Sequence, residues 1–298
     1  MASDKKLRNK SIVFTILTIV LWLWALSYIF VVVWGLVTSC RNGIAFAIND
    51  SSMFGLTDKK RLPTLEITYT LKNFAKAFSE IKDDITGTSF FGMFANSLWI
   101  TFGMDFASII IKITTAYALA FYDFKGKGAI HKFFILQMII PGFGSMNSTY
   151  RLLATMGMID NPLFLLSMIS GHGMTMLIFH GYFVGLSRSY AEAARIDGAN
   201  EFLIFFKISL PMAKSVIAAL FVQSFIGLWQ DYGSVLIYFP SYPTLATGLF
   251  TYSARAAYVM DTPTYFAGLL IANIPITILF CIFNKTMLEN ITIGGLKG

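Results

Sequence analysis

Isolated ionisable residues inside apolar stretches are the first candidates for chemistry in this chain. Asp105 and Lys112 lie seven residues apart in one such stretch, and His172 and His180 lie eight apart in another. On a helix, Asp105 and Lys112 share a face but are separated by roughly 10 Å of rise, which is too far for a direct ion pair. The two histidines have no carboxylate or cysteine on their segment (residues 162–186), so we expect no metal site there.

Sequence motifs for nucleotide binding or catalysis are missing from the sequence. It has no G-x-x-x-x-G-K-[ST] motif, so we expect that this chain does not bind ATP by a P-loop. No pair of nucleophile and base and no zinc motif stands out, which argues against an enzyme. Cys40 and Cys281 are far apart in the sequence, and we expect neither a disulfide nor a metal site.

The composition explains the isolation of these charges. Apolar residues make up 56% of the 298 residues and charged residues 13%, against roughly 25% charged in soluble proteins. A transmembrane helix needs about 20 apolar residues, so there is room for several. We therefore expect an all-α polytopic membrane protein, and we do not interpret the net charge of +7 as a sign of nucleic-acid binding.

The apolar segments predict six transmembrane helices. The predicted spans are residues 12–38, 90–121, 133–150, 162–186, 212–238 and 262–284. Pro141, Gly142 and Gly144 should break the third span. Since broken helices in transporters line cavities, this break is expected to line one, with a packing kink as an equal alternative. The remaining parts are a tail (1–11), an outer loop (39–89) and a second tail (285–298), with a transporter core over 90–284.

The segment 187–211 between the fourth and fifth spans differs in composition. It carries five charges between Glu192 and Lys207, each costing roughly 2.5–3.5 kcal/mol at a helix centre, so it should lie outside the lipid. Ser189 and Glu192 form an S-x-x-E capping box that predicts a helix start. Gly198 should end that helix, and Asn200 should cap a second one, giving a helix–turn–helix at the membrane surface.

Lysine and arginine residues set the expected orientation. They are concentrated in the N-terminal tail, the loop after the second span, the segment 187–211 and the C-terminal tail. By the positive-inside rule, both termini and the segment 187–211 should face the cytoplasm.

The same segment also carries a family signature. Its residues are Glu192, Ala193, Ala194, Gly198, Ile208, Leu210 and Pro211. This E-A-A…G…I-x-L-P pattern resembles the loop of permease subunits in ATP-binding cassette importers, and the extended EAARIDGA is similar to the carbohydrate (maltose-type) branch. Asn96-Ser97-Leu98, residues 116–127 and the closing residues 294–298 agree, so the resemblance covers about residues 90–298.

The resemblance implies a function and a set of partners. The chain would be half of a translocation pathway for a sugar or oligosaccharide in a bacterial or archaeal cytoplasmic membrane. It would pair with a second permease subunit, two nucleotide-binding ATPase subunits that hold ATP and Mg, and an extracytoplasmic solute-binding protein. The residues expected to couple to the ATPase are Glu192, Ala193, Ala194, Asp197, Gly198, Ile208, Leu210 and Pro211. In this chain itself we expect no bound cofactor.

Polar residues within spans are the candidates for the pathway. They are Asn96, Asp105, Lys112, Gln137, Asn147, Trp229 and Asp231. The alternative is that they serve packing within the bundle. For the whole protein, the alternatives are a permease of the same class for another solute and an ion-driven secondary transporter, and for residues 187–211 a loop that merely caps two helices.

Overall fold

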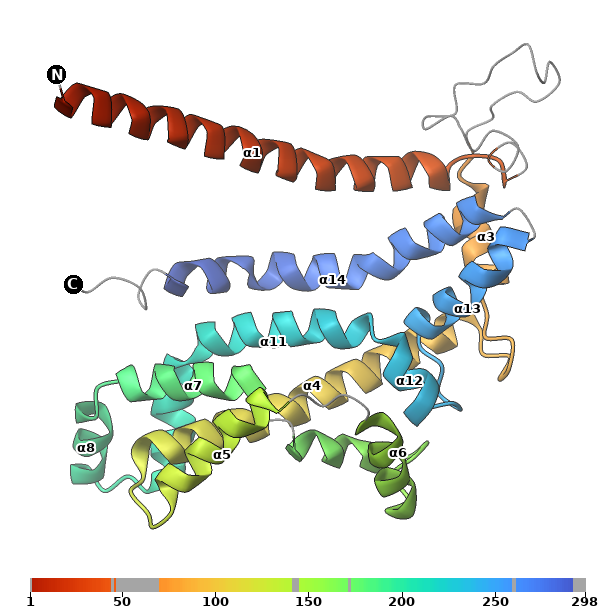
Figure 1. Ribbon diagram of the computed structural model, residues 1–298. Helices are drawn as coiled ribbons and strands as arrows, with labels where there is room; N and C mark the ends of the chain where they lie inside the picture. The colour runs from red at the N-terminus through yellow and green to blue at the C-terminus, as the bar shows by residue number, and fades with distance from the viewer. Residues whose placement is uncertain are drawn as a thin grey trace, which may run out of the picture. The chain divides into compact units, whose positions relative to one another are not determined.

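Within the residues that it describes, the protein contains helices and no strands. The computed structural model describes residues 2–43, 46, 70–140, 145–170, 173–258 and 261–291. The chain divides into two units, whose helices are labelled in Figure 1. The first comprises Met1–Lys82 and Leu249–Ala272, and the second comprises Asp83–Gly248 and Asn273–Gly298.

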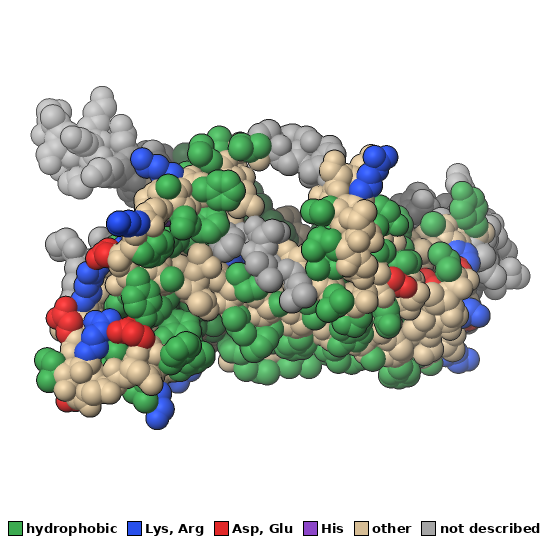
Figure 2. Space-filling model, turned by 90° about the horizontal axis from the view of Figure 1, so that it is seen from below, with side chains coloured by type: hydrophobic (Ala, Val, Ile, Leu, Met, Phe, Trp, Pro, Cys, Tyr) green, Lys and Arg blue, Asp and Glu red, His purple; other side chains and the backbone are tan. Residues whose placement is uncertain are grey.

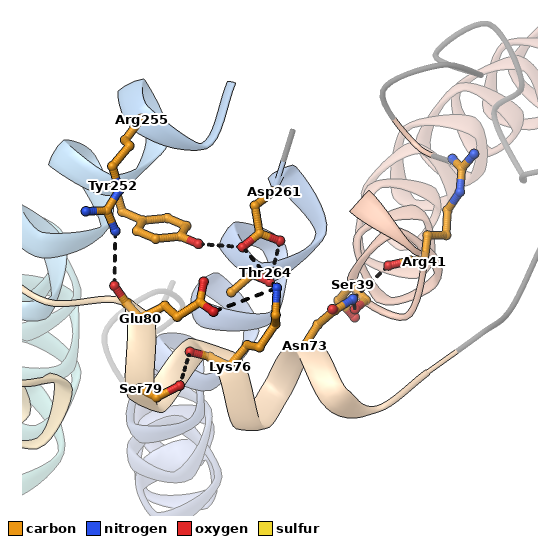
Figure 3. A network of polar contacts seen from close by, with 10 residues as sticks. All are labelled: Ser39, Arg41, Asn73, Lys76, Ser79, Glu80, Tyr252, Arg255, Asp261 and Thr264. Carbon is orange, nitrogen blue, oxygen red and sulfur yellow. Dashed lines mark hydrogen bonds and ion pairs between the residues drawn. The ribbon is translucent and has the colours of Figure 1, made fainter. Parts of the chain in front are cut away.

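Within the described residues, the first unit contains a long apolar helix and several shorter helical segments. These are α1 (Ala2–Ser39), α3 (Lys72–Glu80), most of α13 (Leu245–Tyr258) and the start of α14 (Thr262–Ile291). The side chain of Asn73 on α3 donates to the backbone oxygens of Ser39, at 2.8 Å, and Arg41, at 2.7 Å (Figure 3). These bonds satisfy carbonyls at the C-terminal end of α1, where no intrahelical donor is available.

Asp261 is the second polar centre of this unit. Its carboxylate accepts hydrogen bonds from Tyr252, at 2.9 Å, and Thr264, at 2.7 Å, and lies 3.7 Å from the Lys76 ammonium (Figure 3). Burial, together with the bond to Asp261, raises the pKa of Tyr252. The network therefore joins α3, α13 and the start of α14.

The second unit holds the remaining helices. They are α4 (Phe90–Phe121), α5 (Lys127–Ile139), α6 (Ser145–Thr155), the 3₁₀ helix η1 (Pro162–Ser170), α7 (Gly173–Gly185), α8 (Ser189–Ile196), α9 (Glu201–Ile204), the π-helix η2 (Phe205–Ser209), α10 (Leu210–Met212), α11 (Lys214–Trp229) and α12 (Tyr232–Tyr238). α4 is the central helix, and α7, α11 and η1 pack against it. Its N-cap is Ser89, whose hydroxyl accepts from the Gly92 amide at 3.3 Å.

The core of this unit is built on two stretches of α4. The C-terminal stretch, represented by Ile113 and Tyr117, packs with Phe179 and Phe183 of α7. The N-terminal stretch contributes to a separate cluster, whose buried members are Ile100, Met104, Leu153, Phe164, Val235 and Phe239. Burial of these aromatic and aliphatic side chains fixes α4 as the axis of the unit.

Three helices within the described residues are long and apolar enough to cross a membrane. They are Phe14–Ser39, Phe90–Phe121 and Thr262–Thr286, and a fourth span results if α9–α10 and α11 count as one segment bent by 73°. The predicted second span agrees with α4 at both ends. α1 is longer than the predicted first span, since it begins at Ala2 and takes in the predicted N-terminal tail.

Three of the other predicted spans are each divided in the structure, whereas the sixth lies within the continuous helix α14. The third is divided between α5 and α6, while the break predicted at residues 141–144 lies outside the described residues. The fourth comprises η1 and α7, and the fifth comprises α11 and α12. Periodicity and hydropathy do not reveal such interruptions, because both halves of each segment remain apolar.

Candidate functional site

The turn between α8 and α9 is built by glycine geometry. Gly198 has φ +82°, and the Ala199 amide donates to the Ala194 oxygen while the Gly198 amide donates to that of Arg195, at 2.9 and 3.0 Å. This pair of bonds is a Schellman motif, which ends α8 and satisfies its last carbonyls. Glycine adopts this left-handed conformation without the strain that a Cβ would add.

Local capping follows the sequence prediction at one helix and differs at the other. The Asn200 side chain accepts from the Leu203 amide at 2.8 Å, so the predicted cap of α9 is confirmed. α8 begins at Ser189 as predicted, but Arg188 occupies its N-cap position and makes no side-chain cap bond. The predicted capping box is therefore wrong: the Ser189 hydroxyl lies 2.7 Å from that of Ser187 instead.

The two faces of α8 differ in burial. Ala191 and Ala194 are buried against Ile204 of α9, whereas Glu192 and Ala193 are exposed. Ile196 is on the same side as these two, because residues three and four apart share a helix face, and it is 87% exposed. Of the two signature alanines, Ala194 therefore packs inside the chain, and Ala193 is open to a partner.

An ion pair that the sequence analysis did not single out closes the turn. The Arg195 guanidinium donates to both carboxylate oxygens of Glu201, at 2.7 and 3.2 Å, and the Tyr122 hydroxyl donates to Glu201 at 2.9 Å. The bonds from Arg195 and Tyr122 lower the pKa of Glu201. Burial and the contact with Glu201 raise the pKa of Tyr122 to about 12.

This three-residue network ties α8 and α9 to the end of α4, where Tyr122 is the C-cap. The opposite charges of Arg195 and Glu201 on either side of Gly198 were the available signal in the sequence. Tyr122 could not be found that way, since it is 79 residues from its partner.

The distal half of the signature lies at a bend. Ile208 is on the π-helix η2, and Leu210 and Pro211 form the first turn of α10, where proline is tolerated. α11 then leaves at 73° to the helix that precedes it. One helical connection therefore runs from α8 to α11, with the turn at Gly198 at one end and Pro211 at the other.

Asp105 and Lys112 lie on α4, as predicted, but in different settings. Asp105 is fully buried, and the Ser224 hydroxyl of α11 donates to its Oδ1 atom. Its Oδ2 atom has no hydrogen-bond partner among the described residues. Lys112 is half-buried, and no ion pair with Asp105 occurs within the described part of the chain, in agreement with their spacing.

Three other pathway candidates have structural contacts. Asn96 donates to the Pro243 oxygen at 3.0 Å and accepts from the Trp99 indole at 3.3 Å. Trp229 is buried and stacks on Phe225 with ring centroids 5.6 Å apart. Asp231 caps α12 by accepting from the Ser234 amide at 2.9 Å.

Gln137 on α5 and Asn147 on α6 are exposed, and the structure does not bring them to the other candidates in any contact that it describes. The described residues contain no group of three or more His, Cys, Asp or Glu side chains that could hold a metal ion. Acidic and basic side chains gather over the end of the molecule that carries α8, beside a broad face of hydrophobic side chains (Figure 2).

Comparison with known proteins identifies a family that this chain matches. Residues 7–291 match the family described as binding-protein-dependent transport system inner membrane component. The arabinooligosaccharides transport system permease protein AraQ of Halalkalibacterium halodurans is 29% identical over 78% of this chain and 81% of its own length. The maltodextrin permease protein MdxG of Bacillus subtilis is 28% identical over 85% and 87%. The galactooligosaccharides permease protein GanQ of the same organism is 30% identical over 69% and 74%.

A solved structure supports the fold. The chain matches a bacterial ABC transporter involved in the import of the acidic polysaccharide alginate, with a TM-score of 0.72 and 20% identity. The match covers 93% of this chain and 97% of that one.

Proposed function

Since the chain belongs to the family of binding-protein-dependent transport system inner membrane components, we propose that it is the permease subunit of an ATP-driven importer for an oligosaccharide. It would form half of the translocation pathway and receive the energy of ATP hydrolysis through α8 and α9. The coupling role is supported by one observation, the exposed face of α8.

That face combines charge with an exposed large apolar side chain. Glu192, Ala193 and Ile196 lie on it, and Asp197 follows at the C-cap. Phe202, at the start of α9, is 77% exposed. Apolar side chains held in water beside charged ones are typical of protein–protein interaction sites, which supports this surface as the one that would enter a cleft of the ATPase subunit.

The internal contacts of the loop formed by α8 and α9 support its movement as one rigid unit. Arg195, Glu201 and Tyr122 tie it to α4, and Ala194 packs against Ile204. A displacement of α8 would therefore reach α4 and, through the bend before α11, the helices that line the pathway. Ile208, Leu210 and Pro211 would act by shaping this connection, and Gly198 by permitting the turn.

The cargo and the partners are inferred from the relatives. Three of them are named for arabinooligosaccharides, maltodextrin and galactooligosaccharides, which supports an oligosaccharide for this chain. The partners would be a second permease subunit, two ATPase subunits that bind ATP and Mg, and an extracytoplasmic solute-binding protein. We infer six membrane crossings, several of them interrupted, with both termini in the cytoplasm, because the basic residues concentrate on that side.

Reconstitution tests the function directly. The chain would be produced with the ATPase and permease chains of its own source, purified and placed in liposomes. Binding protein loaded with one of the three oligosaccharides should stimulate ATP hydrolysis and drive uptake of that sugar. Transport that continues without any ATPase subunit would overturn the proposal, and stimulation only by a non-sugar solute would overturn the cargo.

A matched pair of variants tests the coupling surface. Ile196→Glu should prevent copurification of the ATPase while the protein still inserts, because it places a charge in the buried centre of the interface. Ile85→Glu is the control, since Ile85 is 86% exposed. It precedes the N-terminal end of α4, whereas α8 and α9 are tied to the C-terminal end of α4. Equal loss of the ATPase from both variants would contradict the assignment of the surface.

A further inference from the structure

The bend between α10 and α11 opens a groove to which the proposed function assigns no ligand. It has a volume of about 500 Å³ and is bordered by α4, η2, α10, α11 and, through Phe283, α14. Its lining includes Ile110 and Ile113 of α4, Ile217 and Phe221 of α11, and Leu210 at the bend. This volume lies within the range of small-ligand sites.

Two of the lining residues, Lys214 and Thr114, have polar side chains, and the others are apolar. The Thr114 hydroxyl is already bonded to the Ile110 oxygen at 2.7 Å. Lys214, at the first position of α11, is the only charged residue among the described residues of the lining. No ion pair of Lys214 occurs in the described part of the chain, and its side chain is exposed.

The cation lies at one end of the groove. From Lys214 to Phe221 the helix rises by roughly 10 Å, and the apolar lining continues along this length. A long hydrocarbon chain beside Phe221 and an anion beside Lys214 would match the groove in both shape and charge. We propose that this groove binds an anionic phospholipid, with one acyl chain between α4 and α11 and the phosphate at Lys214.

The charge of Lys214 distinguishes this ligand from a neutral one. A lysine near a membrane surface favours an anionic headgroup by about 1 kcal/mol, which corresponds to about fivefold in occupancy. A zwitterionic lipid would fill the apolar part equally well without this gain. Since Leu210 borders the groove, the lipid would also stabilise the bend that connects the α8–α9 loop to α11.

The test uses two photoactivatable lipids in nanodiscs that contain the complete transporter. One is phosphatidylglycerol and the other phosphatidylcholine, each with a diazirine on one acyl chain, and the labelled peptides are identified by mass spectrometry. Phosphatidylglycerol should label the lining segments of α4 and α11. Lys214→Gln should reduce this labelling about fivefold and leave that by phosphatidylcholine unchanged.

Two variants provide the controls. Lys207→Gln removes an exposed lysine of η2 that does not line the groove and should have no effect. Ile110→Trp should fill the groove and reduce labelling by both lipids, whereas Ile278→Trp, at a 54% exposed position of α14, should not.

Two results would overturn the proposal. Equal labelling by both lipids, insensitive to Lys214→Gln, would mean that the groove is only part of the general lipid boundary. Labelling of the isolated chain that disappears in the complete transporter would mean that a second permease subunit covers the groove. Neither result depends on which solute is imported.

Discussion

The Arg195 guanidinium lies 2.7 Å from the Glu201 carboxylate across the Gly198 turn, and the Tyr122 hydroxyl joins the same carboxylate at 2.9 Å. Arg195 and Glu201 are both about 40% exposed, so the pair should contribute less than about 1 kcal/mol to the free energy of unfolding. The ion pair instead positions α8, because it holds the exposed face of this helix at a fixed place relative to α4.

Removal of Arg195 should therefore affect coupling more than stability. In Arg195→Ala we expect a melting temperature close to that of the wild type, faster amide exchange in α8, and a lower ratio of sugar transported to ATP hydrolysed. Arg195→Lys should recover this ratio only in part, because lysine lacks the two-pronged geometry that binds both oxygens of Glu201.

A charge reversal serves as the control for that prediction. Arg195→Glu combined with Glu201→Arg should restore slow exchange in α8 relative to either single variant. If the double variant exchanges as fast as the singles, the ion pair does not position α8.

The network should also define a pH window. The pKa of Glu201 is lowered, so its contribution is present above about pH 4.3 and is lost as the pH falls through its folded pKa. The pKa of Tyr122 is raised to about 12, so its contribution is present below about pH 10 and is lost as the pH rises toward 12.

The tyrosine end of this window is directly measurable. The difference in tyrosinate absorbance between the wild type and Tyr122→Phe should show a titration near pH 12. Glu201→Gln should lower the pKa of Tyr122 only in part, because the carboxylate no longer disfavours the phenolate while burial, the larger cause, remains. A wild-type titration already at about pH 10 would disprove the contact between Tyr122 and Glu201.

Substitution of Gly198 should act through backbone strain alone. A Cβ at this position would meet no atom within 4 Å outside the neighbouring residues, but φ is +82°. Gly198→Val should cost about 1–2 kcal/mol at this turn and uncouple ATP hydrolysis from uptake while the protein still inserts. Gly198→Asn should retain most transport, because asparagine tolerates the left-handed region. Normal transport by the valine variant would remove Gly198 from the coupling role.

The buried contact between Asp105 and Ser224 should stabilise the packing of α4 on α11. Ser224→Ala removes the donor to a fully buried carboxylate, and we expect a loss of about 1–3 kcal/mol, measured by thermal unfolding in detergent. Asp105→Asn should be tolerated better than Ser224→Ala, because it removes the charge and keeps hydrogen-bonding groups.

A double-mutant cycle checks the same contact. If the losses from Asp105→Asn and Ser224→Ala simply add, the two side chains do not interact in the membrane.

Several features of the protein follow from the sequence by itself. The low charge content and the apolar run of α4 predict a helical membrane protein and both ends of that helix, because hydropathy over about 20 residues is a local property. The turn at Gly198 and the cap at Asn200 are also local, since each is formed by bonds within a few residues. The signature that begins at Glu192 likewise indicates the family, because all of its residues lie in one short segment of the chain.

The tertiary structure alone decided which side chains of α8 are exposed and which are buried within the chain. Ala193 and Ala194 are identical in sequence terms, yet only Ala194 is buried, because Ile204 packs against one face of α8. The contact of Tyr122 with Glu201 and that of Asp105 with Ser224 join residues 79 and 119 positions apart. No local pattern encodes such pairs, because they form only when the packing of α4 with α7 and α11 brings distant segments together.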